Sequence, residues 1–157
     1  MQSRLASWLT RRLRVNLRRK GLIAGVRRAL ALPPRGGVRR DRLQLHSLST
    51  HMRVTWIARP IHPWDRDLPG VEQDGAFATQ CLEDVDAAIT RLFERFDVIE
   101  SLDIAVLHPV SRESILTGTI VRDEFVRAKR FSIAMRLKMA GLTYEFGRGG
   151  LQPTRCA

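Results

Sequence analysis

Cysteine, lysine and long apolar runs are all scarce in this chain of 157 residues. With only two cysteines, Cys81 and Cys156, no framework of disulfide bonds is expected, and a reducing cytoplasm is the natural location. No apolar run approaches the roughly 18 residues that a membrane-spanning helix requires, so we expect no transmembrane segment. Charged residues recur through positions 11–28 and interrupt the apolar core that a secretory signal would need.

The sequence also lacks the short motifs that carry known chemistry. It contains neither an HExxH motif nor a pair of CxxC motifs, and no glycine-rich phosphate loop joins a strand to a helix. The "GRGG" stretch at 147–150 follows the last expected element and has no helix after it. We therefore expect no cofactor and no metal. The sequence favours a protein without enzymatic activity, although it leaves that question open.

What the chain has in excess is arginine, and its basic residues are unevenly distributed. The formal net charge is +11 at pH 7, yet residues 1–51 alone carry 13 basic residues and one acid. Residues 52–157 carry 14 basic and 15 acidic residues and are therefore nearly neutral. This asymmetry indicates a basic N-terminal extension over 1–51, a folded domain over 52–146 and a loose C-terminal tail over 147–157.

The extension over 1–51 is open to three interpretations. Apolar residues at helical spacing among basic ones favour an amphipathic helix within 1–30 that binds nucleic acid or an anionic membrane surface. The arginine-rich, acid-poor composition also fits an organelle transit peptide. A third interpretation is a start assigned too far upstream, because the composition shifts just before Met52. The candidate anion-binding residues are Arg11, Arg12, Arg14, Arg18, Arg19, Lys20 and, in the folded domain, Arg112.

Regular structure is expected from Met52 onward. Residues 31–51 are rich in proline, glycine and arginine and have little apolar periodicity, so they are expected to be weakly ordered. Beyond them, runs of β-branched and apolar residues predict three strands. These strands are expected over 53–59, 102–107 and 115–121.

One long amphipathic helix is the clearest pattern in the sequence. Apolar residues recur about every 3.6 positions over 77–96, and Asp74 or a neighbour is suited to cap the start of this helix. Two short helices are expected after the third strand. Ser132 is a good cap for the second of them, and Gly141 is a good residue to end it. The "LTYEF" stretch at 142–146 is expected to add a short fourth strand.

The expected order of elements is β-α-β-β-α-α-(β), in which the last strand is short. A strand, a helix and a strand in succession usually form a right-handed crossover with parallel strands. The next connection is a six-residue loop and predicts an antiparallel pair. We therefore expect one small α+β domain that has a mixed sheet of three or four strands with helices mainly on one face.

Two histidine–proline pairs follow the strands that are expected to be parallel. The carboxyl ends of parallel strands meet at one edge of a sheet, so His62 and His108 are expected at the same rim, where ligands often bind. Asp65 and Asp67 follow in the first loop, and Arg112 follows in the second. Such a cluster would suit a zinc or iron ion, general base catalysis by a histidine and an aspartate, or a phosphate held by arginine.

A structural interpretation of this rim is nevertheless favoured over a catalytic one. A histidine before proline is often a turn residue, and an aspartate side chain often bonds to the backbone of its own loop. Met135 and Met139 lie four residues apart on an expected helix and are predicted to fill the core. The last two helices also carry a modest basic group that would suit nucleic acid or an acidic partner. Its members are Arg127, Lys129, Arg130, Arg136 and Lys138.

These observations favour a small non-catalytic binding or interaction module, whose partner is most simply another protein. One alternative is a nucleic-acid-associated protein that uses the basic extension, for which binding would weaken steeply with added salt. The other alternative is a metal-binding or hydrolytic enzyme with its site at His62 and His108.

Overall fold

In the two central strands, buried residues alternate with more exposed ones. β2 (His51–Ile57) and β3 (Ser101–Leu107) each bury every second residue. Successive side chains of a strand point to opposite faces, so one face of each strand is apolar and the other is largely polar. The strands predicted over 53–59 and 102–107 are confirmed, with small shifts at their ends.

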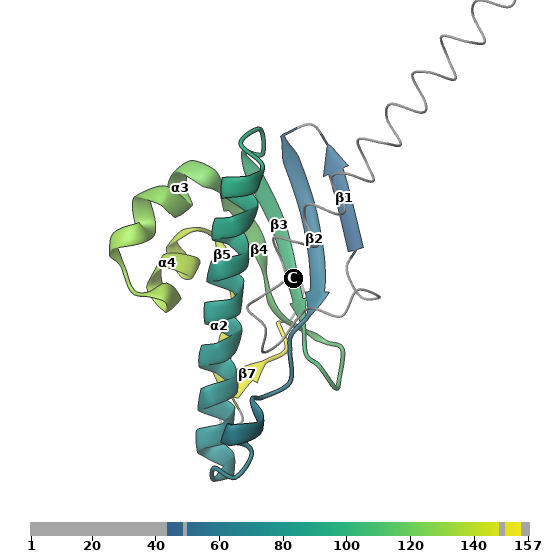
Figure 1. The fold of residues 1–157 in the computed structure, drawn as a ribbon, viewed down its shortest axis with the longest axis vertical. Helices are drawn as coiled ribbons and strands as arrows, with labels where there is room; N and C mark the ends of the chain where they lie inside the picture. The colour runs from purple at the N-terminus through teal and green to yellow at the C-terminus, as the bar shows by residue number, and fades with distance from the viewer. Residues whose placement is uncertain (1–43, 49, 148–149, 155–157) are drawn as a thin grey trace, which may run out of the picture.

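The computed structural model describes residues 44–48, 50–147 and 150–154. The candidate anion-binding residues from Arg11 to Lys20 lie outside these ranges, so the interpretations of the extension stay predictions. Within the described ranges the chain forms a small α+β domain around a mixed sheet (Figure 1). The predicted fold class is confirmed.

The sheet has the order β1-β2-β3-β4-β5 and contains one parallel pair. β2 and β3 are parallel, as the predicted crossover requires. β4 (Ser114–Val121) returns antiparallel to β3, and the two-residue strand β5 (Leu142–Thr143) pairs antiparallel with β4. The mixed character of the sheet therefore comes from one crossover followed by one hairpin.

A strand also forms inside the segment that was expected to be weakly ordered. β1 (Gln44–Leu48) pairs antiparallel with β2, in a register that places His46 opposite Arg53. Sequence periodicity did not predict this strand, because "QLHSL" has no regular alternation. Backbone hydrogen bonding to the free edge of β2 needs no such alternation. The sheet thus extends beyond the predicted domain start at Met52.

The long helix, α2 (Gly70–Arg95), is confirmed but begins about two turns earlier than predicted. Pro69 occupies the capping position, where no side chain caps the helix, so the predicted cap at Asp74 is wrong. Gln73 instead secures the entry, because its side-chain amide donates to the backbone carbonyls of Arg66 and Leu68 at 2.6 and 2.8 Å. Pro69 fixes a backbone angle that is compatible with a helix start.

Three short helical segments follow β4, and we call residues 122–139 the α3–α4 lobe. The segments are α3 (Arg122–Arg127), η3 (Ala128–Arg130) and α4 (Ile133–Met139). Ser132 occupies the position before α4 as predicted, although its side chain makes no capping hydrogen bond. The lobe lies beside α2 and projects away from β1 and β2 (Figure 1).

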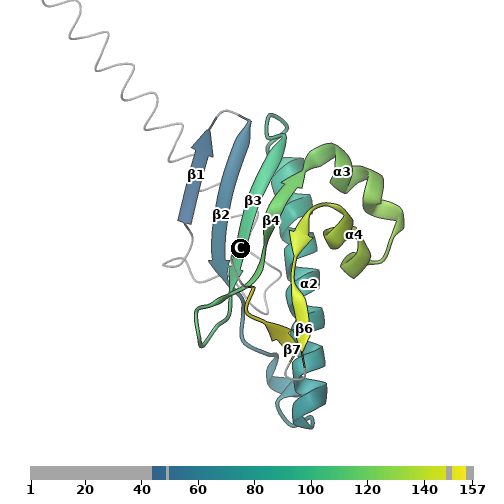
Figure 2. The ribbon, with the colours of Figure 1, turned by 180° about the vertical axis from the view of Figure 1, so that it is seen from behind.

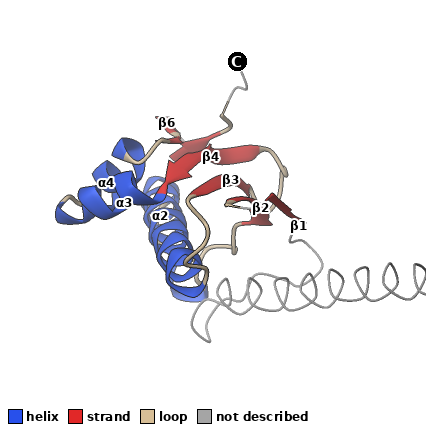
Figure 3. Ribbon diagram, turned by 90° about the horizontal axis from the view of Figure 1, so that it is seen from above, coloured by secondary structure: helices blue, strands red, loops and turns tan. Residues whose placement is uncertain are grey.

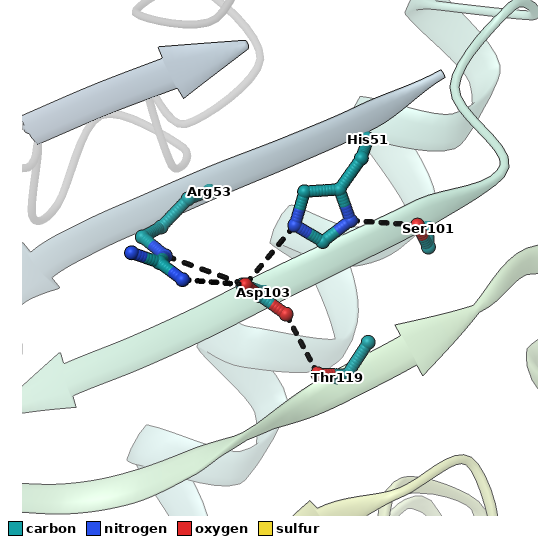
Figure 4. A network of polar contacts seen from close by, with 5 residues as sticks. All are labelled: His51, Arg53, Ser101, Asp103 and Thr119. Carbon is teal, nitrogen blue, oxygen red and sulfur yellow. Dashed lines mark hydrogen bonds and ion pairs between the residues drawn. The ribbon is translucent and has the colours of Figure 1, made fainter. Parts of the chain in front are cut away.

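The helices lie on one side of the sheet, and the core lies between them and the strands (Figure 3). α2 supplies Cys81, Val85, Ile89 and Leu92 to this core, which are all buried. Figure 2 views the sheet from the opposite side, where no described helix crosses its strands. We call this second surface the uncovered face, and it includes His51, Arg53, Ser101, Asp103 and Thr119 (Figure 4).

Close backbone contact explains the isolated glycine in β4. A Cβ atom on Gly118 would lie only 2.2 Å from the carbonyl oxygen of Gly141, which precedes β5. Gly141 has a φ of +103°, a conformation that favours glycine, as expected at the end of α4. A side chain at position 118 would therefore require the backbone around Gly141 to move.

The segment expected to be a loose tail contains a strand. β6 (Glu145–Gly147) and β7 (Gly150–Gln152) pair antiparallel as a second, two-stranded sheet. Leu151 is buried in the core cluster, and Thr154 donates its backbone N–H to the carbonyl of Ser114 at 2.7 Å. Burial of one leucine and pairing to the start of β4 hold this segment, features that its short sequence did not reveal.

Candidate functional site

The predicted histidine rim exists as a topological feature, because β2 and β3 end at the same edge of the sheet. His62 precedes the short 3-10 helix η2 (Pro63–Asp65), and its Nδ1 accepts the backbone N–H of Trp64 at 3.4 Å. Its ring also stacks on the Trp64 ring, with centroids 6.3 Å apart. His62 thus acts as a local turn residue.

His108 has the same kind of local role in the loop after β3. Its Nδ1 accepts the backbone N–H groups of Val110 and Ser111 at 3.3 and 3.2 Å. Its ring meets the ring of Phe77 edge-on, with centroids 5.6 Å apart. Within the described residues, the hydrogen bonds of the two imidazoles therefore go to their own loops.

The structure brings His62 and Asp65 together but does not gather the whole predicted cluster. Both residues line a shallow pocket of about 390 Å³, together with Arg59, Gln80 and Glu83. His108 and Asp67 do not line this pocket. The pocket carries charges of both signs and lies against the first half of α2.

Arg112 stands apart from that pocket as an exposed turn residue. Its φ is +66°, an uncommon angle for a residue with a side chain, and its backbone N–H donates to the carbonyl of His108 at 3.2 Å. Across the described ranges, no group of three or more histidine, cysteine or acidic side chains is arranged to hold a metal ion. The metal-binding and hydrolytic interpretations of the rim stay predictions.

A partly buried ion pair borders the pocket. Nε of Arg59 donates to Oδ2 of Asp84 at 2.6 Å, and burial still raises the pKa of Asp84 although Arg59 acts to lower it. Cys81, one helical turn earlier on α2, is buried, and burial with the nearby Asp84 charge raises its pKa to about 12. A thiol with so high a pKa is not a reactive nucleophile at neutral pH.

The most connected polar cluster lies elsewhere, on the uncovered face, and sequence reasoning missed it (Figure 4). His51 lies directly across from Ser101 in the parallel β2–β3 register, and its Nδ1 is 2.8 Å from the Ser101 hydroxyl oxygen. Its Nε2 is 3.0 Å from Oδ2 of Asp103. His51 lies within the range predicted to be the extension, which is why the sequence did not indicate its role. The alternation of polar and apolar residues in β3 is the signal that could have indicated this face.

Asp103 is the centre of this cluster. Its Oδ2 also accepts from Nη2 and Nε of Arg53 at 3.1 and 3.3 Å, while its Oδ1 accepts from the Thr119 hydroxyl at 2.6 Å. Partial burial acts to raise the pKa of Asp103, but the hydrogen bonds from Thr119, Arg53 and His51 outweigh burial and lower it. Asp103 is therefore an ionised acceptor at neutral pH.

The α3–α4 lobe differs in charge from the rest of the domain. It contains six basic and two acidic residues, whereas residues 50–121 contain six basic and twelve acidic ones. Arg122 is used internally, because it donates to the carbonyls of Phe93 and Ile99 at 2.9 and 2.8 Å and to that of Phe96. Phe93 lies in the last turn of α2, whose carbonyls the helix itself leaves free, and Phe96 and Ile99 lie in the connection that follows.

Arg136 is the second basic residue of the lobe with an internal role. It forms a two-point ion pair with Asp86 of α2, with Nε donating to Oδ1 at 2.7 Å. The same guanidinium donates to the carbonyl of Lys129 at 3.3 Å and lies 5.7 Å from the centre of the Phe125 ring. Planar two-point pairing of this kind holds α4 against α2 with a defined orientation.

The remaining four basic residues of the lobe form no ion pair with any described residue. They are Arg127, Lys129, Arg130 and Lys138, and all are exposed. Three apolar side chains of the same lobe are also about half exposed. They are Val126, Met135 and Met139, at 52%, 51% and 50% of their full surface. The predicted burial of both methionines is therefore wrong.

No protein-family model, curated protein or solved structure was found to match the chain. Among the described helices, none combines the length and apolar character needed to cross a membrane.

Proposed function

We propose that this protein is a small interaction module that binds an acidic, partly apolar protein segment through the α3–α4 lobe. One observation carries the proposal: four basic side chains without a described ion-pair partner share one lobe with three half-exposed apolar side chains. Methionine is over-used at adaptable binding surfaces, because its side chain is flexible and polarisable. Basic residues around such a surface select acidic partners and speed their encounter.

The internal connections of the lobe support this role. Arg122 holds the lobe to the last turn of α2 and Arg136 holds it to Asp86 near the middle of the same helix, so its exposed side chains stand on a defined support. Met135 and Met139 lie four residues apart on α4 and therefore share a face. A rigid support lowers the entropy that binding must overcome.

A pair of charge-reversed variants tests the proposal. The chain without residues 1–43 is used, so that the basic extension does not contribute, and its cooperative thermal unfolding serves as the folding control. A fluorescent helical peptide rich in glutamate and leucine is the probe, and anisotropy measures its Kd. We expect Lys129→Glu with Arg130→Glu to weaken binding at least about tenfold, which corresponds to about 1.4 kcal/mol.

The matched control is Arg66→Glu with Arg112→Glu, which makes the same charge change at two other exposed arginines. This variant should bind the peptide within about twofold of the unaltered chain, because neither residue belongs to the lobe. Equal weakening by both variants would show that net charge alone attracts the peptide, and the lobe would lose its assigned role.

The apolar part of the surface has its own test. Met135→Ser with Met139→Ser should weaken the glutamate–leucine peptide but not a peptide of glutamate alone, because only the first offers apolar side chains. Preferential binding of a nucleic acid duplex to the lobe, with no response to the methionine changes, would favour a phosphate backbone as the partner instead.

A second candidate function rests on the charge of the extension. Residues 1–51 carry 13 basic residues and one acid, a composition suited to the phosphate backbone of nucleic acid. Removal of residues 1–43 should then abolish duplex binding by the full chain. Unchanged, salt-sensitive binding by the shortened chain would exclude this role for the extension.

A further inference from the structure

Three side chains of the uncovered face form a continuous proton path. The Ser101 hydroxyl oxygen is 2.8 Å from Nδ1 of His51, and Nε2 of the same ring is 3.0 Å from Oδ2 of Asp103. A nucleophile within hydrogen-bond reach of a base, with that base oriented by a third group, is the arrangement that activates a hydroxyl. The three residues come from two neighbouring strands (Figure 4).

The ionised carboxylate of Asp103 determines which nitrogen of His51 carries the proton, and therefore the direction of the hydrogen bond between Ser101 and His51. Its carboxylate only accepts hydrogen bonds when ionised, so Nε2 of His51 carries the proton and donates it to Oδ2. In a neutral imidazole the other nitrogen, Nδ1, then has the free electron pair. The Ser101 hydroxyl must therefore donate to Nδ1, which is the direction needed for a base that removes its proton.

Two further residues hold Asp103 in place. Thr119, on the neighbouring strand β4, donates to Oδ1 at a distance of 2.6 Å. Arg53, on β2, donates to Oδ2 at a distance of 3.1 Å. Neither bond reaches Ser101 directly, so both are positioning interactions. The carboxylate is held from the two strands that flank its own, β2 and β4, and keeps the His51 ring fixed between two partners.

Ser101 is accessible from solvent on the uncovered face. Ser101 is partly exposed, and its register partner on β4 is Val121, of which 39% is exposed. The hydroxyl thus lies between an imidazole on one side and an apolar side chain on the other. A partly exposed hydroxyl with these two neighbours suits a small substrate with a short apolar group.

We propose that Ser101 is a nucleophile, activated by His51, which accepts an acyl group from a small activated ester. This reactivity is separate from the proposed binding function of the α3–α4 lobe. The hydroxyl oxygen attacks the carbonyl carbon while its proton moves to Nδ1 of His51. The bond to the leaving alcohol then breaks, and that alcohol takes the proton from Nδ1. The products are O-acyl-Ser101 and a free alcohol, and water releases the acyl group in a second step.

Acetylation of the full-length chain by p-nitrophenyl acetate tests this inference. Released p-nitrophenol gives the rate, and mass spectrometry of peptides locates the acetyl group. We expect Ser101 to be acetylated at least about 100-fold faster than Ser132, an exposed serine whose side chain makes no capping bond, because a positioned general base contributes about that factor or more.

Substitution separates activation from mere exposure. Ser101→Ala should remove the fast acetylation, and His51→Gln should slow it at least about 100-fold while Ser101 remains present. Asp103→Asn should slow it as well, because the amide no longer enforces the required tautomer of His51. Thermal unfolding of each variant serves as the folding control, since all three positions are on the uncovered face.

The outcomes are distinct. Acetylation of Ser101 at the rate of Ser132, or equal acetylation of Ser101 in the His51→Gln chain, would overturn the inference. Acetylation only at the lysines, of which the chain has three, would overturn it too. None of these results depends on peptide binding by the lobe, so this inference and the proposed function fail independently.

Discussion

The two faces of the sheet are built from the same strands, yet they differ in almost every physical respect. On the covered face, Val54 and Leu102 are fully buried beneath α2. On the uncovered face, His51, Arg53 and Asp103 form a polar cluster that is partly open to solvent. Because strand side chains alternate, stability and surface chemistry are assigned to alternate residues. Changes on the first face should unfold the domain, and changes on the second should alter its reactivity.

The largest effect is expected from Leu92→Ala on the covered side. Leu92 is 1% exposed and lies in the core cluster, so the change removes buried apolar surface and leaves a cavity. We expect a loss of about 2–5 kcal/mol in the free energy of unfolding, measured by urea denaturation. Glu94→Ala, at an exposed position of the same helix, should stay within about 0.5 kcal/mol. Similar losses for both variants would mean that this side of α2 is not packed as described.

A smaller but substantial effect is expected from Arg122→Met. The change removes three charge-assisted hydrogen bonds to carbonyls of the last turn of α2 and the loop after it while keeping an unbranched side chain. We expect a loss of about 1.5–3 kcal/mol in the free energy of unfolding. Arg127→Met is the matched control, because its described hydrogen bond goes only to the nearby Asp123 carbonyl, at 3.3 Å. A neutral result at Arg122 would show that water satisfies those carbonyls equally well.

On the uncovered face, the effect of Asp103→Asn on the thermal stability of the domain should depend on pH. The folded-state pKa of Asp103 is lowered, so its carboxylate stabilises the fold above its unfolded pKa of about 3.9. That stabilisation is lost as the pH falls through this value toward the folded pKa. The Tm difference between the unaltered chain and the variant should therefore shrink from pH 7 to pH 3. A constant difference would contradict the lowered pKa, and Asp67→Asn is the exposed control.

The smallest effect is expected from Arg53→Ala. The Arg53 side chain is 63% exposed, and its ion pair with Asp103 is therefore screened by water and salt. We expect a loss of about 0.2–1 kcal/mol, which should decrease in urea titrations with added salt. A loss as large as that of Leu92→Ala would erase the distinction between the two faces.

The sequence predicted those parts of the fold that follow from local periodicity. Alternation identified β2 and β3, and the 3.6-residue period identified α2, because burial on one side imposes these repeats. The crossover rule then placed β2 parallel to β3. β1 was missed because edge pairing through the backbone requires no apolar repeat.

The site was harder to predict, since its members meet through sheet register rather than sequence spacing. His51 lies 50 residues from Ser101 and acquires its role only when two strands align. His62 and His108 attracted attention because each precedes proline, and the structure places both in local turn roles. Helical spacing made Met135 and Met139 look like core residues, but it could not show that nothing described covers their face.

Arg122 has a consequence for the order in which this domain assembles. Its three carbonyl partners lie between 23 and 29 residues earlier in the chain, and the β3–β4 hairpin separates them from Arg122. The last turn of α2 and the loop after it therefore gain these three hydrogen bonds only once that hairpin has docked, and an isolated α2 peptide should fray at its C-terminal end. Helix completion and hairpin docking become one cooperative event. Amide exchange near Phe96 should accordingly report unfolding of the hairpin as well as of the helix.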